Sequence, residues 1–462
     1  MKDTPIEYTD VREVEGPLVV VRGVQDVGWD EAACVRLSSG EERAGVVLEV
    51  DSDVAVVQVY EGGSGIAPAE IGVSFLGSPP RVKVSEAWLG RVWSGSGEPL
   101  DGGPRVLSGE VREVAGNPLN PAARVTPADP VLTGVAAIDM MTTLVRGQKL
   151  PVFSRGGLPH LELAAQIAAQ AHVGDEAFCV VFAAMGVTHA DAAMVRDVLE
   201  TRAAGGELVL FLNTADDPIA ERLLTPRLAL TVAEHLAFDR GYHVLVVMAD
   251  MTSYCEALRE VASARDVIPA RRGYPGYLYS DLASIYERCG RLRDRPGSIT
   301  QLPVLTMPAG DITHPVPDLT GYITEGQLVL SPDIAARGVY PPIDPLASLS
   351  RMMRRGVGPG RTRVEHREVA AQLDAAVARA RQTSDLAELV GTDALTPTDR
   401  RYLVFLDAFE NDLVRQRVDE TLSIDETFTR AWRALSVLPR RELTMIPVRV
   451  LDEWYRPGDR EG

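Results

Sequence analysis

The chain has 462 residues, of which 45% are hydrophobic, and a formal net charge of −18. This length allows about three domains with ordinary apolar cores, whereas the acidic excess argues against a basic nucleic-acid groove and against direct binding to an anionic membrane. No apolar run reaches the ~18 residues that span a bilayer, and the N-terminus has no apolar signal core. We therefore expect a cytoplasmic chain with no nucleic-acid partner and no direct membrane insertion.

Residues 1–75 predict a small β-domain. Turn-like "SSGEE" and "DSD" separate four apolar runs, which read "PLVVVRG", "AACVRLSS", "RAGVVLEV" and "VAVVQVYEG". Valine-rich runs between tight turns are typical of a small β-barrel or sandwich. A connecting segment follows over residues 76–131, because the glycines and prolines of "SGSGEPLDGGP" and "GNPLNPAARVTPADP" exclude long helices.

Apolar strands alternate with helical stretches from about residue 132 to residue 345. Helical patterns follow the runs "LPVF", "FCVVFAAM", "LVLFLN" and "HVLVVMAD", and further strands are predicted at "ITQLPVLTM" and "GQLVLS". Continuous apolar strands between amphipathic helices predict a buried parallel sheet with helices on both faces. Together with the connecting segment, residues 76–345 are predicted to form an α/β domain of the phosphate-loop NTPase type.

The composition changes near the C-terminus, and residues 346–462 are predicted to form an α-helical bundle. Only 4 of the 31 prolines and 3 of the 40 glycines lie after residue 360, which favours long helices. Ser423 and Glu426 have the spacing of a capping box. Apolar residues recur at helical spacing at Val369, Leu373, Ala376, Val377 and Ala380, and at Leu406, Phe409 and Leu413.

The stretch "FSRGGLPHLE", residues 153–162, resembles a phosphate-binding loop. It follows the strand "KLPVF" and opens onto a helix, so its free backbone N–H groups form an anion cradle. In the frame G-x-x-x-x-G-K-[ST], Ser154 and Pro159 take the glycine positions, His160 the lysine position and Leu161 the hydroxyl position. The candidate contacts of this degenerate nucleotide site are Ser154, Arg155, Gly156, Gly157, His160 and Asp250.

The cradle lacks the groups that turn over ATP. Phosphate-loop hydrolysis needs a lysine on the phosphates and a hydroxyl on magnesium. Lysine occurs only at Lys2, Lys83 and Lys149, and Lys149 precedes the strand that leads into the loop. The sequence therefore predicts that this chain does not hydrolyse ATP by itself.

Two residues near the cradle allow two interpretations each. Asp250 ends the strand "HVLVVMAD", where it either holds a magnesium shell or caps the next helix, and we favour the cap. His160 either donates to a phosphate when protonated or only begins the helix, and we favour the second. The histidines do not cluster and the four cysteines form no C-x-x-C, so no metal site is predicted.

Several longer stretches narrow the family. "LVRGQKLPVFS", "LFLNTADDP", "LTPRLALTVAEHLAF", "RRGYPGYLYSDLASIYERCG", "VPDLTGYITEGQ" and "VYPPIDPLASLSRMM" resemble the non-catalytic B subunit of vacuolar and archaeal-type rotary ATPases, from about residue 8 to 445. At the cradle, the resemblance implies the sequence "SGSGLPHNE", whereas this chain has "SRGGLPHLE". Arg155 thus stands where the family pattern has a glycine. Catalytic relatives carry a glutamate after the second strand, where this chain has Gly186, Val187 and Thr188.

The resemblance implies a function within a complex. It implies a ring in which three A and three B subunits alternate, with contacts to the central rotor stalk and the peripheral stator stalk, attached peripherally to the membrane. It also implies a chain with no cofactor of its own, with ATP or ADP at the subunit interface and Mg²⁺ in the partner's site. The complex couples ATP synthesis or hydrolysis to proton transport.

Arg351, in "PLASLSRMMRRG", is the candidate catalytic residue. Taken alone, an arginine close to Arg354 and Arg355 is typical of a solvated helix face. The resemblance instead implies an arginine finger that acts in trans on the ATP of the neighbouring A subunit. The alternatives are a self-sufficient ATPase with an aberrant loop and a pure scaffold, while a secretion-system ATPase is expected to retain the lysine and the glutamate.

Overall fold

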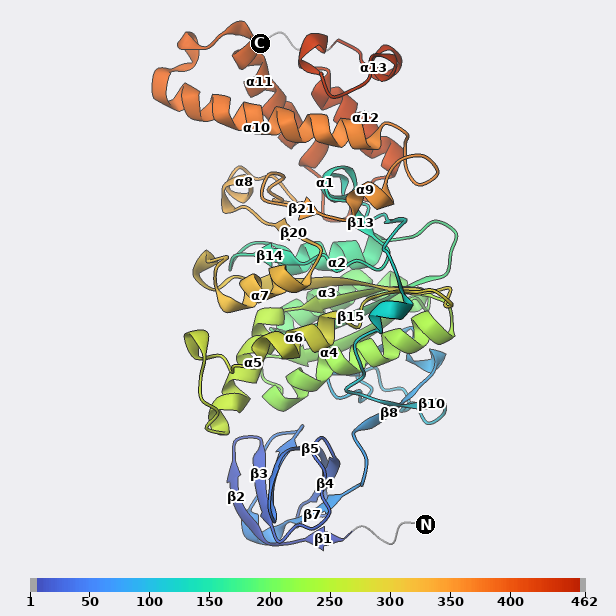
Figure 1. Ribbon diagram of the computed structural model, residues 1–462, viewed down its shortest axis with the longest axis vertical. Coiled ribbons are helices and arrows are strands. Elements are labelled where there is room, and N and C mark those ends of the chain that lie inside the picture. The colour runs from blue at the N-terminus through green and yellow to red at the C-terminus, as the bar shows by residue number, and fades with distance from the viewer. Residues whose placement is uncertain (1–5, 458–462) are drawn as a thin grey trace. The chain divides into compact units, whose positions relative to one another are not determined.

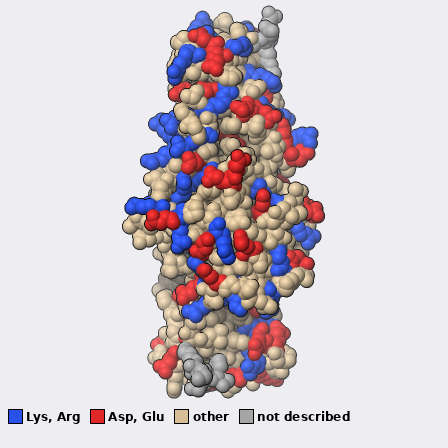
Figure 2. Space-filling model, turned by 90° about the vertical axis from the view of Figure 1, so that its right-hand side faces the viewer, with Lys and Arg blue, Asp and Glu red and all other residues tan. Residues whose placement is uncertain are grey.

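The computed structural model describes residues 6–457 (Figure 1). The chain forms two compact units, the first with residues 1–121, 179–288 and 295–297, the second with residues 122–178, 289–294 and 298–462. Within the described range, no helix has both the length and the hydrophobicity to cross a membrane. On the face drawn in Figure 2, acidic and basic side chains are interspersed with uncharged ones.

The N-terminal part of the first unit is a curled antiparallel sheet of seven strands in the order β1-β7-β4-β5-β6-β3-β2. Its core is valine-rich, and Val19, Val47 and Val57 are fully buried. The four predicted runs form β3 to β6, as expected. Three short or charged strands, β1, β2 and β7, lack such a run. The bounds are β1 Glu7–Tyr8, β2 Val11–Glu15, β3 Leu18–Arg22, β4 Ala32–Arg36, β5 Glu42–Asp51, β6 Val54–Val59 and β7 Gly72–Phe75.

The first unit also holds strands of the α/β fold, in the order β17-β15-β16-β9. β15 pairs parallel with β16, and β16 pairs parallel with β9. All seven residues of β17 are buried, so both faces of this strand are covered, as predicted. The strands are β9 Arg91–Ser94, β15 Phe178–Val187, β16 Leu208–Thr214 and β17 His243–Ala249, and the helices are α3 His189–Ala204, α4 Ile219–Glu234, α5 Met251–Ala264 and α6 Leu278–Tyr286.

The second unit contributes strands in the order β21-β20-β14-β19. β14 pairs parallel with β19 and β20, and β21 runs antiparallel to β20. Their bounds are β14 Val152–Ser154, β19 Ser298–Thr306, β20 Gly326–Val329 and β21 Leu349–Ser350, with helices α2 His160–Gln170 and α7 Pro315–Ile323. Shorter elements of the two units are β8 Arg81–Val84, β10 Glu110–Glu113, β11 Arg124–Val125, β12 Pro130–Val131, α1 Ala136–Met141, β13 Leu144–Val145, β18 Gly290–Leu292, α8 Pro332–Ala336 and α9 Met353–Gly356.

The chain ends in helices, as predicted: α10 His366–Val390, α11 Pro397–Ala408, α12 Ile424–Leu435 and α13 Val448–Trp454. The capping box of Ser423 and Glu426 is present at the start of α12. One predicted apolar face begins one residue earlier than expected, because Phe405, four residues before Phe409, is fully buried and Leu406 is half-buried. After α11 the chain continues into a π-helical turn over Phe409–Val414.

His366 begins α10 and is completely buried. Its Nε2 lies 3.0 Å from the carbonyl oxygen of Met140 and its Nδ1 lies 2.9 Å from Oγ1 of Thr362. The edge of its ring packs against Phe428. This burial lowers the pKa of His366 to about 4. The neutral ring therefore belongs to the folded chain at neutral pH.

We expect His366 to make folding stability depend on pH. In the unfolded chain the histidine has a pKa of about 6.5, whereas in the folded chain its pKa is about 4. Between these pH values the unfolded state therefore binds a proton that the folded state does not. The stability contributed by the neutral ring is thus complete above pH ~6.5 and falls by up to about 3 kcal/mol as the pH drops to about 4. In urea unfolding, the free-energy gap between the wild type and His366→Gln should shrink accordingly between neutral and acidic pH. A gap that stays constant would contradict the assignment.

Candidate functional site

The predicted cradle lies at the end of β14, where residues 155–159 turn into α2. Gly157 has φ +85°, which only glycine adopts readily. A Cβ atom added at Gly156 or Gly157 would meet no atom within 4 Å, so the mouth of the loop is open. The N–H groups of these two glycines donate to no residue in the range 6–457. The loop can therefore hold an anion through its backbone.

The side chains of the loop are engaged within the protein. Ser154 is fully buried, and its Oγ donates to the carbonyl oxygen of Arg155. His160 Nδ1 lies 2.8 Å from the Leu158 carbonyl oxygen, and Nε2 lies 3.4 Å from Oγ1 of Thr306. These contacts favour the interpretation of His160 as a helix-start residue. Neither His160 nor the apolar Leu161 that follows it has a side-chain oxygen, so these two positions offer no ligand to Mg²⁺.

Arg155, the departure from the family pattern, lies along the neighbouring turn Pro308–Gly310. A Cβ atom on Gly310 would lie 2.6 Å from Nε of Arg155, closer than any real contact. The absence of a side chain at residue 310 thus makes room for the arginine. This accommodation joins residues that are far apart in sequence, and no local pattern predicts it.

Two further predicted positions begin helices in the first unit. Oδ1 of Asp250 accepts a hydrogen bond from the N–H of Thr252 at 2.6 Å, which confirms the helix-cap interpretation for α5. Thr188, at the turn where catalytic relatives are expected to carry a glutamate, forms a capping box with Asp191 at the start of α3. Both side chains are thereby used to satisfy helix N-termini.

Arg351 follows β21 directly and is exposed. Its N–H donates to the carbonyl oxygen of Glu325 at 3.0 Å, and the one hydrogen bond of its guanidinium within residues 6–457 goes to the carbonyl oxygen of Thr324, at 3.4 Å. In the described part of the chain, no carboxylate lies within ion-pair distance of Arg351, Arg354 or Arg355. These three positive charges are therefore available to an anion from outside the chain.

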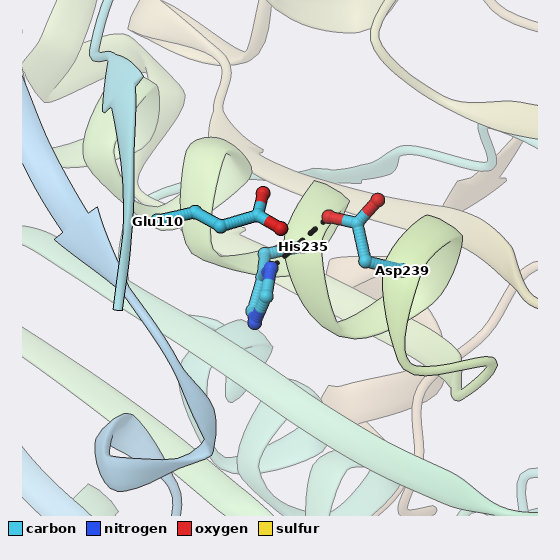
Figure 3. Close-up of side chains that lie close together, drawn as sticks. All are labelled: Glu110, His235 and Asp239. Carbon is cyan, nitrogen blue, oxygen red and sulfur yellow. Dashed lines mark hydrogen bonds and ion pairs between the residues drawn. The ribbon is translucent and has the colours of Figure 1, made fainter. Parts of the chain in front are cut away.

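One cluster of residues has a composition that could suit a metal ion. Ligand atoms of Glu110, His235 and Asp239 lie within 4.8 Å of one another (Figure 3). However, the guanidinium of Arg112 donates to Glu110 at 2.8 Å and to Asp239 at 2.7 Å. An arginine already supplies the positive charge between these carboxylates, so the cluster is an ion-pair network that joins β10 to the π-helical turn His235–Asp239 after α4.

Three family models match the sequence. They are the ATP synthase alpha/beta family β-barrel domain over residues 11–77, the nucleotide-binding domain of the same family over residues 134–350, and the C-terminal domain of V and A type ATP synthase over residues 355–455. The B subunit of the A-type ATP synthase of Aeropyrum pernix is 53% identical over 458 residues, or 99% of each chain. The chain belongs to the B-subunit family of A/V-type ATP synthases.

A solved structure of an ATP synthase subunit is also similar to this chain. The ATP synthase subunit NeqB from Nanoarcheaum equitans is 37% identical, with a TM-score of 0.72, over 91% of this chain and 98% of that chain. The resemblance drawn from the sequence and the predicted fold class, a β-barrel, an α/β phosphate-loop core and a helical C-terminal part, are both confirmed. Membership in a family of ATP synthase subunits implies that this chain works in a multi-subunit complex.

Buried polar contacts position the backbone next to Arg351. The sequence alone does not reveal these contacts. Nε2 of Gln148 donates to Oγ of Ser350 at 2.9 Å and to the carbonyl oxygen of Glu325 at 3.2 Å. Lys149, which is only 3% exposed, forms an ion pair of 3.1 Å with Glu325. Lys149 thus has a structural partner in place of a phosphate. The contacts hold residues 350 and 351 against Gln148 and Glu325 and leave the Arg351 side chain exposed.

Proposed function

We propose that this chain is the non-catalytic, regulatory B subunit of a rotary ATP synthase head and that it supplies Arg351 to the ATP site of a neighbouring A subunit. The observation that carries the proposal is the exposed guanidinium of Arg351, which contacts one carbonyl oxygen and no carboxylate among residues 6–457. Because no carboxylate of the described residues neutralises this guanidinium, its positive charge can interact with an anion of a neighbouring subunit. The planar guanidinium fork can bind two oxygens of a phosphate group at once.

The cradle of this chain supports the non-catalytic half of the proposal. Leu161 is buried and apolar at the position where a hydroxyl would bind magnesium, and both ring nitrogens of His160 have protein partners. Without a lysine and a magnesium ligand, an ATP or ADP molecule at the interface is held but not split. The Mg²⁺ that catalysis needs belongs to the partner's site.

In the proposed mechanism, the fold positions one charge. The pairing of β21 with β20 and the contacts of Gln148 and Glu325 hold the backbone of Arg351 in place. The guanidinium then stabilises the negative charge that spreads over the transferred phosphoryl group in the transition state. The assembled complex, attached peripherally at the cytoplasmic face of the membrane and linked to rotor and stator stalks, couples this chemistry to proton transport.

The proposal predicts that the isolated chain releases no phosphate from ATP. Purified catalytic A subunits mixed with this chain should form a complex that does, because the two halves of the site then meet. The measurement is phosphate release by the chain alone, by the partner alone and by the mixture, each after gel filtration. Steady phosphate release that elutes with the lone chain would favour a self-sufficient ATPase and contradict the proposal.

A further inference from the structure

A cavity of about 650 Å³ lies in the first unit, and its lining includes neither residues of the cradle nor Arg351. One wall is the outer face of the barrel strands β5 and β6, with Val46 and Leu48. The opposite wall is formed by α4 and α5, with Leu224, Leu258 and Val261. The volume falls within the range of about 300–1,000 Å³ that small-molecule sites occupy, and its walls are mainly apolar.

The barrel wall carries a buried hydrogen-bond donor without an acceptor. Ala55, Val57 and Val59 lie in the barrel core, so Gln58 between them lies on the outer face of β6. Gln58 lines the cavity and is only 5% exposed, yet its Nε2 has no partner among residues 6–457. An outward-facing strand residue is normally solvated. Gln58 is instead buried, and its Nε2 donor lacks the hydrogen-bond acceptor that buried polar groups normally have.

The opposite side of the cavity has a second donor of the same kind. Arg265 also lines the cavity, and its buried Nε has no partner among the described residues, while its Nη2 pairs with Glu49 at 3.1 Å. Leaving a buried donor unpaired destabilises a protein. An acceptor oxygen that enters the cavity would satisfy such groups.

The buried charges around the cavity have partners of opposite charge, and the remaining charged lining residue, Asp30, is exposed. Arg227 donates to Oδ1 of Asp281 at 2.6 Å, and the hydroxyl of Tyr254 donates to Oδ2 of the same carboxylate at 2.5 Å. Arg265 is neutralised by Glu49. Asp30 lines the cavity but is exposed to solvent. The interior therefore offers no unpaired charge to a charged ligand, and an ion would lose its hydration without compensation.

We propose that this cavity binds an uncharged, mainly apolar small molecule that presents an acceptor oxygen to Gln58. Apolar walls, paired charges and unmet donors together define that class of ligand. Because one wall belongs to the barrel and the other to the helices of the α/β fold, a bound molecule contacts both.

The test is a fluorescence titration of the full chain with prodan, an uncharged naphthalene ketone with a single carbonyl acceptor. We expect one saturable site with blue-shifted emission and a Kd of about 1–50 μM, as suits a ligand of this size. Bound prodan should also raise the melting temperature, because it binds only the folded chain. Absence of saturable binding up to the solubility limit of prodan would overturn the proposal.

Three variants locate the site. Leu224→Trp fills the cavity and should weaken binding at least about 10-fold, whereas Gln58→Leu removes the donor and should weaken it about 5- to 10-fold. Leu107→Trp is the matched control, because residue 107 is 74% exposed and does not line the cavity. Circular dichroism of each variant checks folding. Equal binding by all three variants would mean adsorption elsewhere and sink the proposal, and because the isolated chain is titrated, that failure would leave the proposed function standing.

Discussion

Replacing Arg351 with alanine is expected to lower ATP turnover of the assembled head by about 10³- to 10⁵-fold, the range that arginine fingers contribute. The side chain is exposed and makes one 3.4 Å contact, to the carbonyl oxygen of Thr324, so its loss should leave folding and assembly intact. The measurement is steady-state hydrolysis by heads reconstituted from A subunits and the variant, with assembly checked by gel filtration. Turnover near that of the wild type would support the pure scaffold alternative.

Two further variants make this comparison specific. Arg351→Lys keeps the charge but loses the planar fork, so turnover should lie between the alanine variant and the wild type. Arg417→Ala removes the same charge from an exposed ion pair with Asp419 in the C-terminal part and should change turnover little. An equal loss in Arg417→Ala would show that net charge, rather than the position of residue 351, matters.

Arg288→Met is expected to lower the free energy of unfolding by about 3–5 kcal/mol, the usual result of removing one partner of a buried ion pair. Arg288 is 1% exposed and donates to both carboxylate oxygens of Glu234, at 2.7 and 2.9 Å. It also donates to the carbonyl oxygens of Val114 and Ala115. The variant keeps the apolar stem but takes the Arg288 donors away from Glu234 and from the Ala115 carbonyl oxygen, while the Val114 carbonyl oxygen still accepts from Oγ1 of Thr231 at 3.0 Å.

Chemical denaturation of the isolated chain measures this loss. Arg36→Met is the matched control, because Arg36 forms exposed ion pairs with Glu7 and Glu42, and it should cost no more than about 1 kcal/mol. Adding Glu234→Leu to Arg288→Met should recover part of the lost stability, since the unpaired carboxylate is then removed too. A loss in Arg288→Met as small as in the control would contradict the structural role of the pair.

Periodic features of the fold could be predicted from the sequence. β17 is a continuous buried run, β5 contains a valine-rich run next to a tight turn, and the capping box of α12 is a local signal, so each of these elements is found where it is expected. β9 has no such signal, because its four residues lie in a segment rich in glycine and proline and are recognised only by pairing with β16. The apolar face drawn through Leu406 begins instead at Phe405, because both residues have helical spacing to Phe409 and only the packing of the helix selects between them.

The candidate site shows the same division. The loop residues follow from a motif, and Arg351 follows from the family resemblance. The residues that hold them do not, because Glu325 and Gln148 reach residue 351 only through tertiary contacts. Gly310 makes room for Arg155 across about 150 residues of chain, and Gln58 lies in a valine run that resembles an ordinary barrel strand. Contacts between residues that are far apart in the sequence leave no periodic pattern, so the sequence alone does not predict them.

Single-turnover kinetics of the reconstituted head test the central claim most directly. Rapid-quench measurement of ATP cleavage separates the chemical step from rotation and product release. If Arg351 acts on the neighbour's phosphate, the cleavage step itself slows in Arg351→Ala heads by the same large factor as steady-state turnover. A cleavage step that keeps its wild-type rate while only steady-state turnover falls would place Arg351 in the motion of the head and contradict its role in the chemistry.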